Sequence, residues 1–413
     1  MEDINPLYRR VAGIDVHRML HVVTAIVEKP DGTIEQSSRQ FGGFKRDCRE
    51  LSRWLVELNV ELVVMESTGV YWKSLYSHLE RAGIEAWVVN AYSIKHVPGR
   101  KTDMSDSQWL AILARFGLVR ASFIPPQDLR ELRLLSRYRR KLVAVRAAEV
   151  NRLHKMLDDG GIKLGGVVSD LNGVSARAMV AGLIENKPIN VLLNLANTRL
   201  KCTTEQLEAA LDGDLTSRHL FLLTHLHQHI NWLDEHLAAL DAYLLNAMTP
   251  YQWAHRLLQT IPGIDQIASA LILIEIGDDM TRFGCADRLA SWAALCPGNH
   301  ESAGKRKSGK TRKGNALIRY ILCECANAAR LTKSSLAGKF KAMKARKSHK
   351  KVVVAIAHKM IRIIYLMLTR KVPYHDPNID YEALSAKKNA PRWIKQLRLI
   401  NQWPPKPLSA TSA

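Results

Sequence analysis

Residues 1–120 alternate apolar and amphipathic stretches in an order that few folds can accommodate. The run "RVAGIDVH" is predicted to be a strand, and "LHVVTAIVEKPDGTIEQSSRQF" two more strands that turn at Pro30-Asp31-Gly32. After them, helical and strand-like periods alternate, which gives the order β-β-β-α-β-α-β-α. Three consecutive strands followed by this alternation are the order of the RNase H-like fold. We therefore expect an α/β domain over residues 1–125, closed by Pro125 and Pro126.

The rest of the chain has a helical period, so we expect all-α structure there. In residues 126–250, apolar side chains recur at steps of four and three, which is the seam of a heptad repeat. The seam is formed by Leu226, Ile230, Leu233, Leu237, Leu240 and Leu244. It fits a helical hairpin within one chain and a coiled coil between chains equally well. We expect residues 126–250 to be a helical spacer, residues 251–375 a helical C-terminal domain, and residues 376–413 a poorly ordered tail.

The chain is strongly basic, with a formal net charge of +21. Such a protein holds a polyanion or lies on an acidic membrane surface. No apolar run approaches the roughly 18–20 residues that span a bilayer, and the acidic N-terminus is unlike a secretory signal. The six cysteines lack the spacing of a zinc site or a disulfide framework. We expect a cytoplasmic, nucleoid-associated protein that binds nucleic acid and no membrane.

Four carboxylates of the first domain are predicted to converge. Asp15 lies in the middle of a strand and Glu66 ends another, where a carboxylate without a partner is costly. Asp103 and Asp106 share one face of a helix start. Helix capping explains that pair but not the two strand acids. A pair of Mg²⁺ ions about 3.5–4 Å apart explains all four, because such ions clamp a phosphate and activate the attacking oxygen. His17 is expected at the edge of this site.

The segment 296–321, "CPGNHESAGKRKSGKTRKGNALIRYI", concentrates positive charge next to a serine, Ser302. Six cations fall within nine positions: Lys305, Arg306, Lys307, Lys310, Arg312 and Lys313. The glycines between them would let backbone N–H groups close on a phosphate while the cations neutralise a nucleic-acid strand. On composition alone, Ser302 is a solvated loop residue. Arg319, one turn into the next helix, is either a phosphate fork or a surface charge.

Further candidate contacts lie outside this loop. "TIPGIDQIASALI" fits a helix-hairpin-helix turn in which Gly263 exposes backbone N–H groups to a phosphate, and it fits a plain helix–helix turn nearly as well. A second basic block, 340–351, is expected to contact phosphates. A third basic surface is expected from Arg130, Arg133, Arg137, Arg139, Arg140 and Lys141. Three nearby histidines, at 225, 227 and 229, are read as polar helix positions rather than zinc ligands.

The blocks "GIDVH", "ESTGVYW" and "GRKTDMSDSQWLA" resemble the three acidic motifs of the DEDD-type insertion-sequence transposases, whose N-terminal domain is RuvC-like. "LCPGNHESAGKRKSGKTRKGNALIRYIL" resembles that family's C-terminal transposase motif, and the blocks together cover most of residues 10–375 in the family's order. The resemblance implies a DNA transposase in which Asp15, Glu66, Asp103 and Asp106 hold Mg²⁺. It also implies that Ser302, five residues after Pro297, is the nucleophile that forms a phosphoserine link with DNA. Ala303 stands where the family commonly has glycine, and Ser308 is the rival serine.

The resemblance further implies partners. In the family, the two halves of each site come from different subunits and a structured RNA encoded by the element selects the DNA sequences. We therefore expect a homo-oligomer, a dimer or tetramer, with the heptad region as one interface, and a guide RNA. Two alternatives stay open: a metal-dependent RNase H-like nuclease or resolvase in which water attacks, and an inactive nucleic-acid-binding protein.

Overall fold

The strands form where the apolar alternation predicts them. A computed structural model describes residues 5–67, 69–90, 94, 104–196, 200–298, 300–311 and 314–400, and the chain divides into two compact units, Met1–Gln127 and Asp128–Ala413. The strands of the first unit are β1 (Arg10–Val16), β2 (Leu20–Glu28), β3 (Ile34–Gly42), β4 (Leu62–Glu66) and β5 (Glu85–Val89). Its helices are α1 (Lys45–Glu57), α2 (Trp72–Arg81) and α4 (Asp106–Arg115). Over the described residues, the expected order of strands and helices is confirmed.

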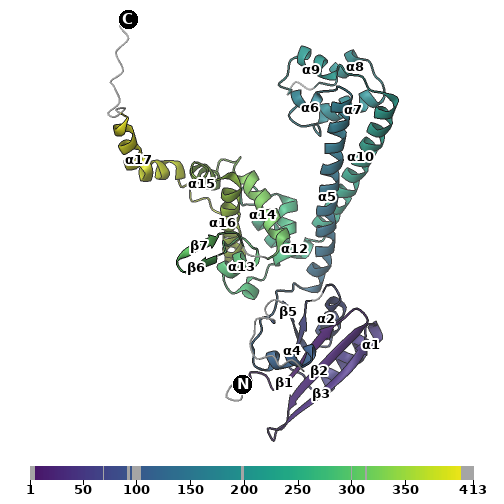
Figure 1. Cartoon of the computed structure of the whole chain (residues 1–413), viewed down its shortest axis with the longest axis vertical. Helices are drawn as coiled ribbons and strands as arrows, with labels where there is room; N and C mark the ends of the chain where they lie inside the picture. The colour runs from purple at the N-terminus through teal and green to yellow at the C-terminus, as the bar shows by residue number, and fades with distance from the viewer. Residues whose placement is uncertain are drawn as a thin grey trace. The chain divides into compact units, whose positions relative to one another are not determined.

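The five strands form one mixed sheet in the order β3-β2-β1-β4-β5 (Figure 1). β1 to β3 are an antiparallel meander, while β4 runs parallel to β1 and β5 parallel to β4. Apolar residues at alternate positions face two cores, one shared with α1 and α2 and the other with α4. The strand directions and order are those expected of an RNase H-like domain.

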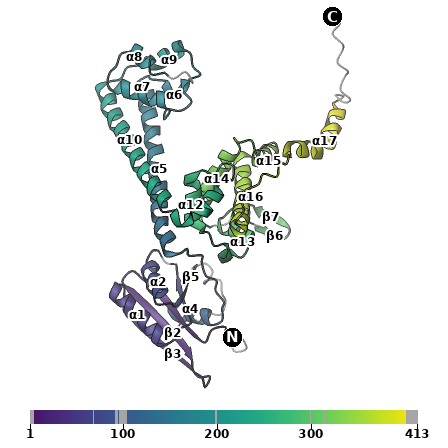
Figure 2. The same ribbon diagram turned by 180° about the vertical axis from the view of Figure 1, so that it is seen from behind.

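The second unit begins with two long helices, α5 (Gln127–Asp159) and α10 (Ser217–Asn246), which lie side by side (Figures 1 and 2). Four short helices between them share a core with both: α6 (Leu164–Val167), α7 (Val174–Ile184), α8 (Ile189–Leu193) and α9 (Thr204–Leu211). Leu226 and Ile230 of the heptad seam are buried in that core together with Leu153 and Leu157 of α5. The structure therefore uses this part of the seam within one chain, as a helical hairpin.

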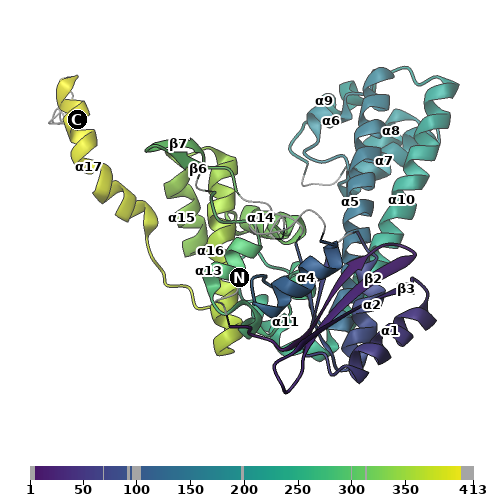
Figure 3. The same cartoon turned by 60° about the horizontal axis from the view of Figure 1, so that its bottom comes forward.

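The remaining helices form a bundle that includes α16 (His349–Arg370) (Figure 3). They are α11 (Gln252–Leu258), α12 (Gln266–Ile276), α13 (Ala286–Trp292), α14 (Ala316–Ala329) and α15 (Ser335–Lys344). Two short 3₁₀ helices, η1 (Thr249–Tyr251) and η2 (Met280–Phe283), join them. A small hairpin of β6 (His300–Ser302) and β7 (Lys305–Ser308) stands between α13 and α14 in the chain. The helical prediction for this region is confirmed except for the hairpin, which sequence reasoning treated as a loop.

Two expectations are corrected here. The tail contains a helix, α17 (Tyr381–Leu399), so poor order was the wrong expectation for those residues; the Tyr381 hydroxyl accepts a 3.0 Å hydrogen bond from Lys359, and Asp380 caps the helix start. By length and composition, α16 is apolar enough to cross a membrane, whereas no such stretch was expected. Half of its apolar window is buried against neighbouring helices, which is typical of a core helix. All six cysteines are free in the structure.

Candidate active site

Asp15 and Glu66 lie at corresponding positions of neighbouring strands. β1 and β4 run parallel and pair as far as Ile14 and Met65, so each acid is the next residue along its strand. Side chains alternate between the faces of a strand. Val11 and Val64 face the core shared with α4, so Asp15 and Glu66, an even number of positions later, share that face. The backbone thus places two of the four predicted carboxylates side by side.

The first turn of α4 lies on the same face. A Cβ on Gly13 would lie only 2.1 Å from the Ser107 carbonyl oxygen, so glycine is what allows α4 to pack directly on β1. The Ser107 hydroxyl forms a 2.9 Å hydrogen bond with the Thr24 hydroxyl of β2. Asp106 begins the helix next to Ser107, and the Ser105 hydroxyl caps it by accepting a hydrogen bond from the Gln108 N–H. These contacts fix Asp106 over β1, near the strand end that carries Asp15.

Convergence of all four acids stays a prediction. Asp103 lies outside the described residues, and within them no group of three or more His, Cys, Asp or Glu side chains is placed to hold a metal ion. The donors that the sheet brings together are carboxylate oxygens, which suit Mg²⁺ in kind.

His17 contacts the predicted site directly. Its Nε2 lies 3.0 Å from Asp15 Oδ2, and the Asp15 side chain is 27% exposed. A histidine bonded to a carboxylate fixes the orientation of that carboxylate, as outer partners of metal ligands do. The position expected for His17, beside the acids, agrees with this contact.

Ser302 ends β6 at a tight turn. β6 and β7 are antiparallel, and Ser302 pairs with Lys305 across the two-residue turn Ala303-Gly304. Both turn residues have positive φ, 49° and 73°, as in the turns that match the twist of a hairpin. The left-handed region costs a residue other than glycine about 1–2 kcal/mol. Ala303 therefore makes this turn more strained than a second glycine would.

The base of the hairpin is tied to the helical body. Pro297 bridges Thr311, and the Gly298 N–H donates to the Lys310 carbonyl at 2.8 Å. Gly314 packs so closely that an added Cβ would lie 2.6 Å from the Trp292 carbonyl oxygen. The hairpin thus projects from a fixed base, beside α13 and α16 (Figures 1 and 2).

A buried carboxylate that sequence reasoning missed holds the end of this segment. Glu275 of α12 is fully buried, and its Oε2 accepts a 2.5 Å hydrogen bond from Asn315 Nδ2. The Asn315 side chain in turn caps α14 by accepting from the N–H groups of Leu317 and Ile318. The available signal was an acid inside the apolar run "ALILIEIG".

Two arginines of α5 neutralise Glu275. Arg133 Nε lies 3.3 Å from Glu275 Oε2, and Arg137 Nη2 lies 3.7 Å from Oε1. Burial lowers the pKa of Arg133 to about 10, although Glu275 acts in the opposite direction. Arg139 similarly pairs with Asp241. The third basic surface expected along α5 is therefore corrected for Arg133, Arg137 and Arg139, which pair with carboxylates of other helices. For Arg130, Arg140 and Lys141 it stays a prediction.

The other predicted contacts have these outcomes. Gly263 has a φ of 88° and packs against α14, where an added Cβ would lie 2.5 Å from the Cys325 carbonyl oxygen. Close packing therefore explains why this position is glycine. The expected contact of Gly263 with a phosphate stays a prediction. Arg319 Nη1 donates to Thr311 Oγ1 at 3.2 Å. Ser308 Oγ accepts from the Lys310 N–H, also at 3.2 Å.

The phosphate contacts assigned to the hairpin itself are only partly within the described structure. Lys305 and Lys310 are exposed. Arg312 and Lys313 lie outside the described residues, as do the side chains of Ser302, Arg306 and Lys307.

Two curated proteins to which this chain is similar are named as transposases. The chain is 26% identical over 330 residues to the "Transposase for insertion sequence element IS1328" of Yersinia enterocolitica, which covers 78% of this chain and 87% of that protein. It is 25% identical over 328 residues to the "Transposase for insertion sequence element IS1111A" of Coxiella burnetii, covering 78% of this chain and 81% of that protein. Both similarities span the two units.

A solved structure is also similar to part of the chain. The Thermus thermophilus RuvC structure matches with 12% sequence identity and a TM-score of 0.23, over 27% of this chain and 99% of that one.

Two family models match in the order of the chain. Residues 12–161 match a model described as "Transposase", for the DEDD transposases of the IS110 type, and residues 255–342 match "Transposase IS116/IS110/IS902 family". The first match contains the acidic strand ends, and the second contains the serine hairpin and Glu275. The chain belongs to the IS110 family of DEDD-type transposases.

Proposed function

We propose that this protein is the DNA transposase of an insertion sequence and that it cuts and rejoins DNA through a covalent link to Ser302. The observation that carries the proposal is the position of this serine, which ends β6 at a two-residue turn on a hairpin with a fixed base. A nucleophile is effective when its approach to the target is held in place. A projecting, anchored turn is suited to reach a phosphodiester.

The proposed step conserves the number of bonds at phosphorus. The Ser302 oxygen forms a bond to phosphorus while one bond from phosphorus to a deoxyribose oxygen breaks. The serine proton passes to a base, and the departing oxygen takes up a proton. The phosphoserine link retains the energy of the broken ester, so attack by another DNA hydroxyl reverses the reaction and joins new ends without a further cofactor.

The carboxylates Asp15, Glu66, Asp103 and Asp106 are proposed to hold Mg²⁺. When bound, such ions steady the charge that develops on the phosphate and activate the attacking oxygen. The support is the adjacency of Asp15 and Glu66 and the position of Asp106 on their face of the sheet. His17 would keep the Asp15 carboxylate oriented toward the ions.

Joining two DNA ends requires at least two sites, so we propose a homo-oligomer. Because part of the heptad seam is buried within the chain, an interface on α10 would use its other side chains, where Phe221, Trp232 and Tyr243 are exposed. A structured guide RNA encoded by the element is proposed from the family resemblance, and the net charge of +21 is compatible with both nucleic acids.

The test is excision in cells. The protein is expressed with its native flanking DNA, and the rejoined junction is amplified for the wild type and for Ser302→Ala, Asp15→Ala and Ser308→Ala. The last variant is the matched control, because it removes a hydroxyl from the same hairpin. We expect a junction from the wild type and from Ser308→Ala, and none from Ser302→Ala or Asp15→Ala.

Other outcomes identify the alternatives. A junction that persists in Ser302→Ala but disappears in Asp15→Ala would favour a metal-dependent nuclease or resolvase in which water attacks. Labelled DNA analysed on a denaturing gel adds a direct readout, because only the serine mechanism leaves DNA covalently bound to protein. DNA binding without any reaction would favour an inactive nucleic-acid-binding protein.

A further inference from the structure

A basic cleft lies beside the base of the serine hairpin. Its volume is about 980 Å³, at the upper end of the roughly 300–1,000 Å³ that ligand sites occupy. One wall is the hairpin base, with Pro297, Lys310 and Thr311, and the other is the junction of α15 and α16 and the first turns of α16. The cleft thus joins two basic blocks that are about 40 residues apart in the sequence.

Cations dominate the lining of this cleft. Among the described residues that line it, five are Lys or Arg and none is Asp or Glu; the five are Lys310, Arg346, Lys347, Lys350 and Lys351. All are exposed, and within the described residues none of them forms an ion pair. Like charges gathered without partners repel one another and favour no folded structure by themselves. An anion with several charges would relieve that repulsion.

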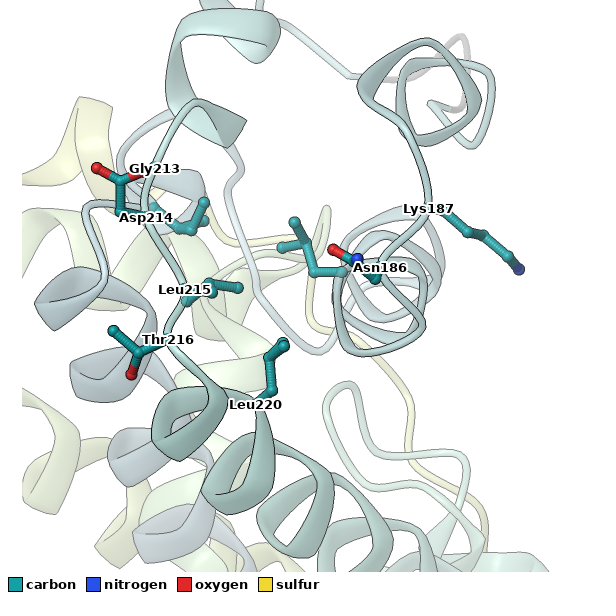
Figure 4. A pocket seen from close by; sticks show the side chains of 9 residues that line it. Asn186, Lys187, Gly213, Asp214, Leu215, Thr216 and Leu220 are labelled. Carbon is teal, nitrogen blue, oxygen red and sulfur yellow. The ribbon is translucent and has the colours of Figure 1, made fainter.

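Another hollow of the same unit shows that this lining is not general. It lies among the end of α7, the segment between α9 and α10, and the start of α10. The lysine in its described lining, Lys187, points away from the other labelled side chains (Figure 4). Lys187 pairs with Glu185 at 2.6 Å, and Asp214 also lines that hollow. The cleft at the hairpin base thus differs from this hollow, because its described lining contains several exposed cations and no acid.

The rest of the lining favours a sugar–phosphate backbone over stacked bases. Leu295, Pro297, Val354 and Ala355 give an apolar floor. No Phe, Tyr or Trp is among the lining residues that the structure describes, so this part of the cleft offers no aromatic side chain of the kind on which proteins stack unpaired bases. Phosphates on the cations and sugars on the apolar floor match both parts of the lining.

We propose that this cleft binds the phosphate backbone of DNA next to the phosphodiester that Ser302 attacks. The inference rests on the proposed function for the position of the cut, but the cleft itself is argued from its own residues. Pro297 and Ser302 are five residues apart, at most about 17 Å of extended chain. That distance spans about five phosphates along one strand of B-DNA. The cleft would thus hold the strand within about five nucleotides of the attacked bond.

The test is the salt dependence of DNA binding by the purified full chain. Binding of a fluorescein-labelled duplex carrying the element's end is followed by fluorescence anisotropy over a range of KCl concentrations. The cleft variant is Lys350→Ala/Lys351→Ala. The matched control is Lys387→Ala/Lys388→Ala, an adjacent and equally exposed pair on α17 that changes the net charge equally.

We expect the cleft variant to flatten the plot of log K against log salt by about 1.8, since each lost phosphate contact removes about 0.9 from the slope. The control should keep the wild-type slope, and both variants should keep the wild-type thermal midpoint. The proposal would be overturned if the cleft variant kept the wild-type slope, or if the control variant lowered the slope by the same amount as the cleft variant. If the cleft variant lowers the salt slope for an RNA duplex of the same sequence but not for the DNA duplex, the proposal is overturned and the cleft binds RNA instead.

Two readouts separate this inference from the proposed function. A wild-type chain that forms no serine–DNA adduct on a denaturing gel contradicts the proposed function, whatever the salt slopes are. A wild-type chain that forms the adduct, with an unchanged slope in Lys350→Ala/Lys351→Ala, contradicts only the cleft. Lys310→Ala, on the opposite wall, provides an independent variant with an expected change in slope of about 0.9.

Discussion

The arginines of α5 and the lysines of the basic cleft have the same appearance in the sequence and opposite surroundings in the structure. Arg133, Arg137 and Arg139 face buried or half-buried carboxylates. Lys350 and Lys351 face a cleft with no acid in its lining. The difference teaches that a cluster of basic residues becomes evidence for nucleic-acid binding only when the fold leaves its charges without partners.

The energetic consequences of the two arrangements are also opposite. Removing the partner of a buried charge lowers the free energy of unfolding by several kcal/mol. Removing an exposed charge that has no partner changes the free energy of unfolding very little. Stability measurements therefore separate the basic residues that the fold requires from those that it does not require, before any DNA is added.

The largest effect is expected at Glu275. Glu275→Ala leaves Arg133, whose side chain is only 13% exposed, as a buried charge without its main partner and removes the hydrogen bond to Asn315. We expect a loss of about 3–5 kcal/mol in the free energy of unfolding. Urea unfolding followed by tryptophan fluorescence measures it. Faster tryptic cleavage within the serine hairpin should accompany the loss, because Asn315 anchors the end of that segment.

Glu275→Gln is the matched variant, since its side-chain oxygen can still accept from Asn315 while the charge is gone. It should destabilise the protein less than Glu275→Ala and keep more of the hairpin's resistance to trypsin. Losses below about 1 kcal/mol in both variants would contradict the structural role given to the α5 arginines.

A smaller and pH-dependent effect is expected at Asp234, which binds Arg146 of α5 and Arg177 of α7. Burial acts to raise the pKa of Asp234, but the hydrogen bonds from both arginines outweigh it and hold the pKa below its ordinary value. Its stabilising contribution is therefore complete above about pH 4, the ordinary Asp value, and is lost as the pH falls through the lower folded value. Asp234→Asn should cost about 1–2 kcal/mol at pH 7.

Thermal unfolding between pH 7 and pH 3 measures this effect. The gap between wild type and Asp234→Asn should narrow below about pH 4, because the unfolded wild-type chain takes up a proton at Asp234 there while the folded carboxylate is still ionised. Asp212→Asn is the control: this aspartate is exposed, and no described residue forms an ion pair with it. A gap that stays constant down to pH 3 would contradict the ion-pair explanation.

The sequence predicted the first unit well because its signals are local. β1, β2 and β4 are short runs of mostly buried apolar residues, and the turn Pro30-Asp31-Gly32 marks the hairpin between β2 and β3. The position of Asp15 beside Glu66 followed from the expected strand order. By contrast, β6 and β7 contain the polar runs "HES" and "KRKS", which have no apolar alternation from which strands could be recognised.

Partners distant in the sequence could not be predicted. Arg133 and Glu275 are 142 positions apart, and the charge pattern of α5 is the same whether its arginines face carboxylates or phosphates. The heptad seam of α10 likewise predicted a helical partner but not which helix. In both cases the missing information was the tertiary contact, which no short motif contains.

The smallest effect is expected in the cleft, and it completes the comparison. Lys347 is exposed, lines the cleft and forms no ion pair with a described residue. Lys347→Ala should therefore change the free energy of unfolding by no more than about 0.5 kcal/mol, with a slight gain favoured because it relieves repulsion among the lysines. Arg133→Ala, the reference from α5, should lose several times more in the same urea titration. A loss above about 1 kcal/mol for Lys347→Ala would show that the protein itself pairs this charge, and the cleft would then have less positive charge available for DNA.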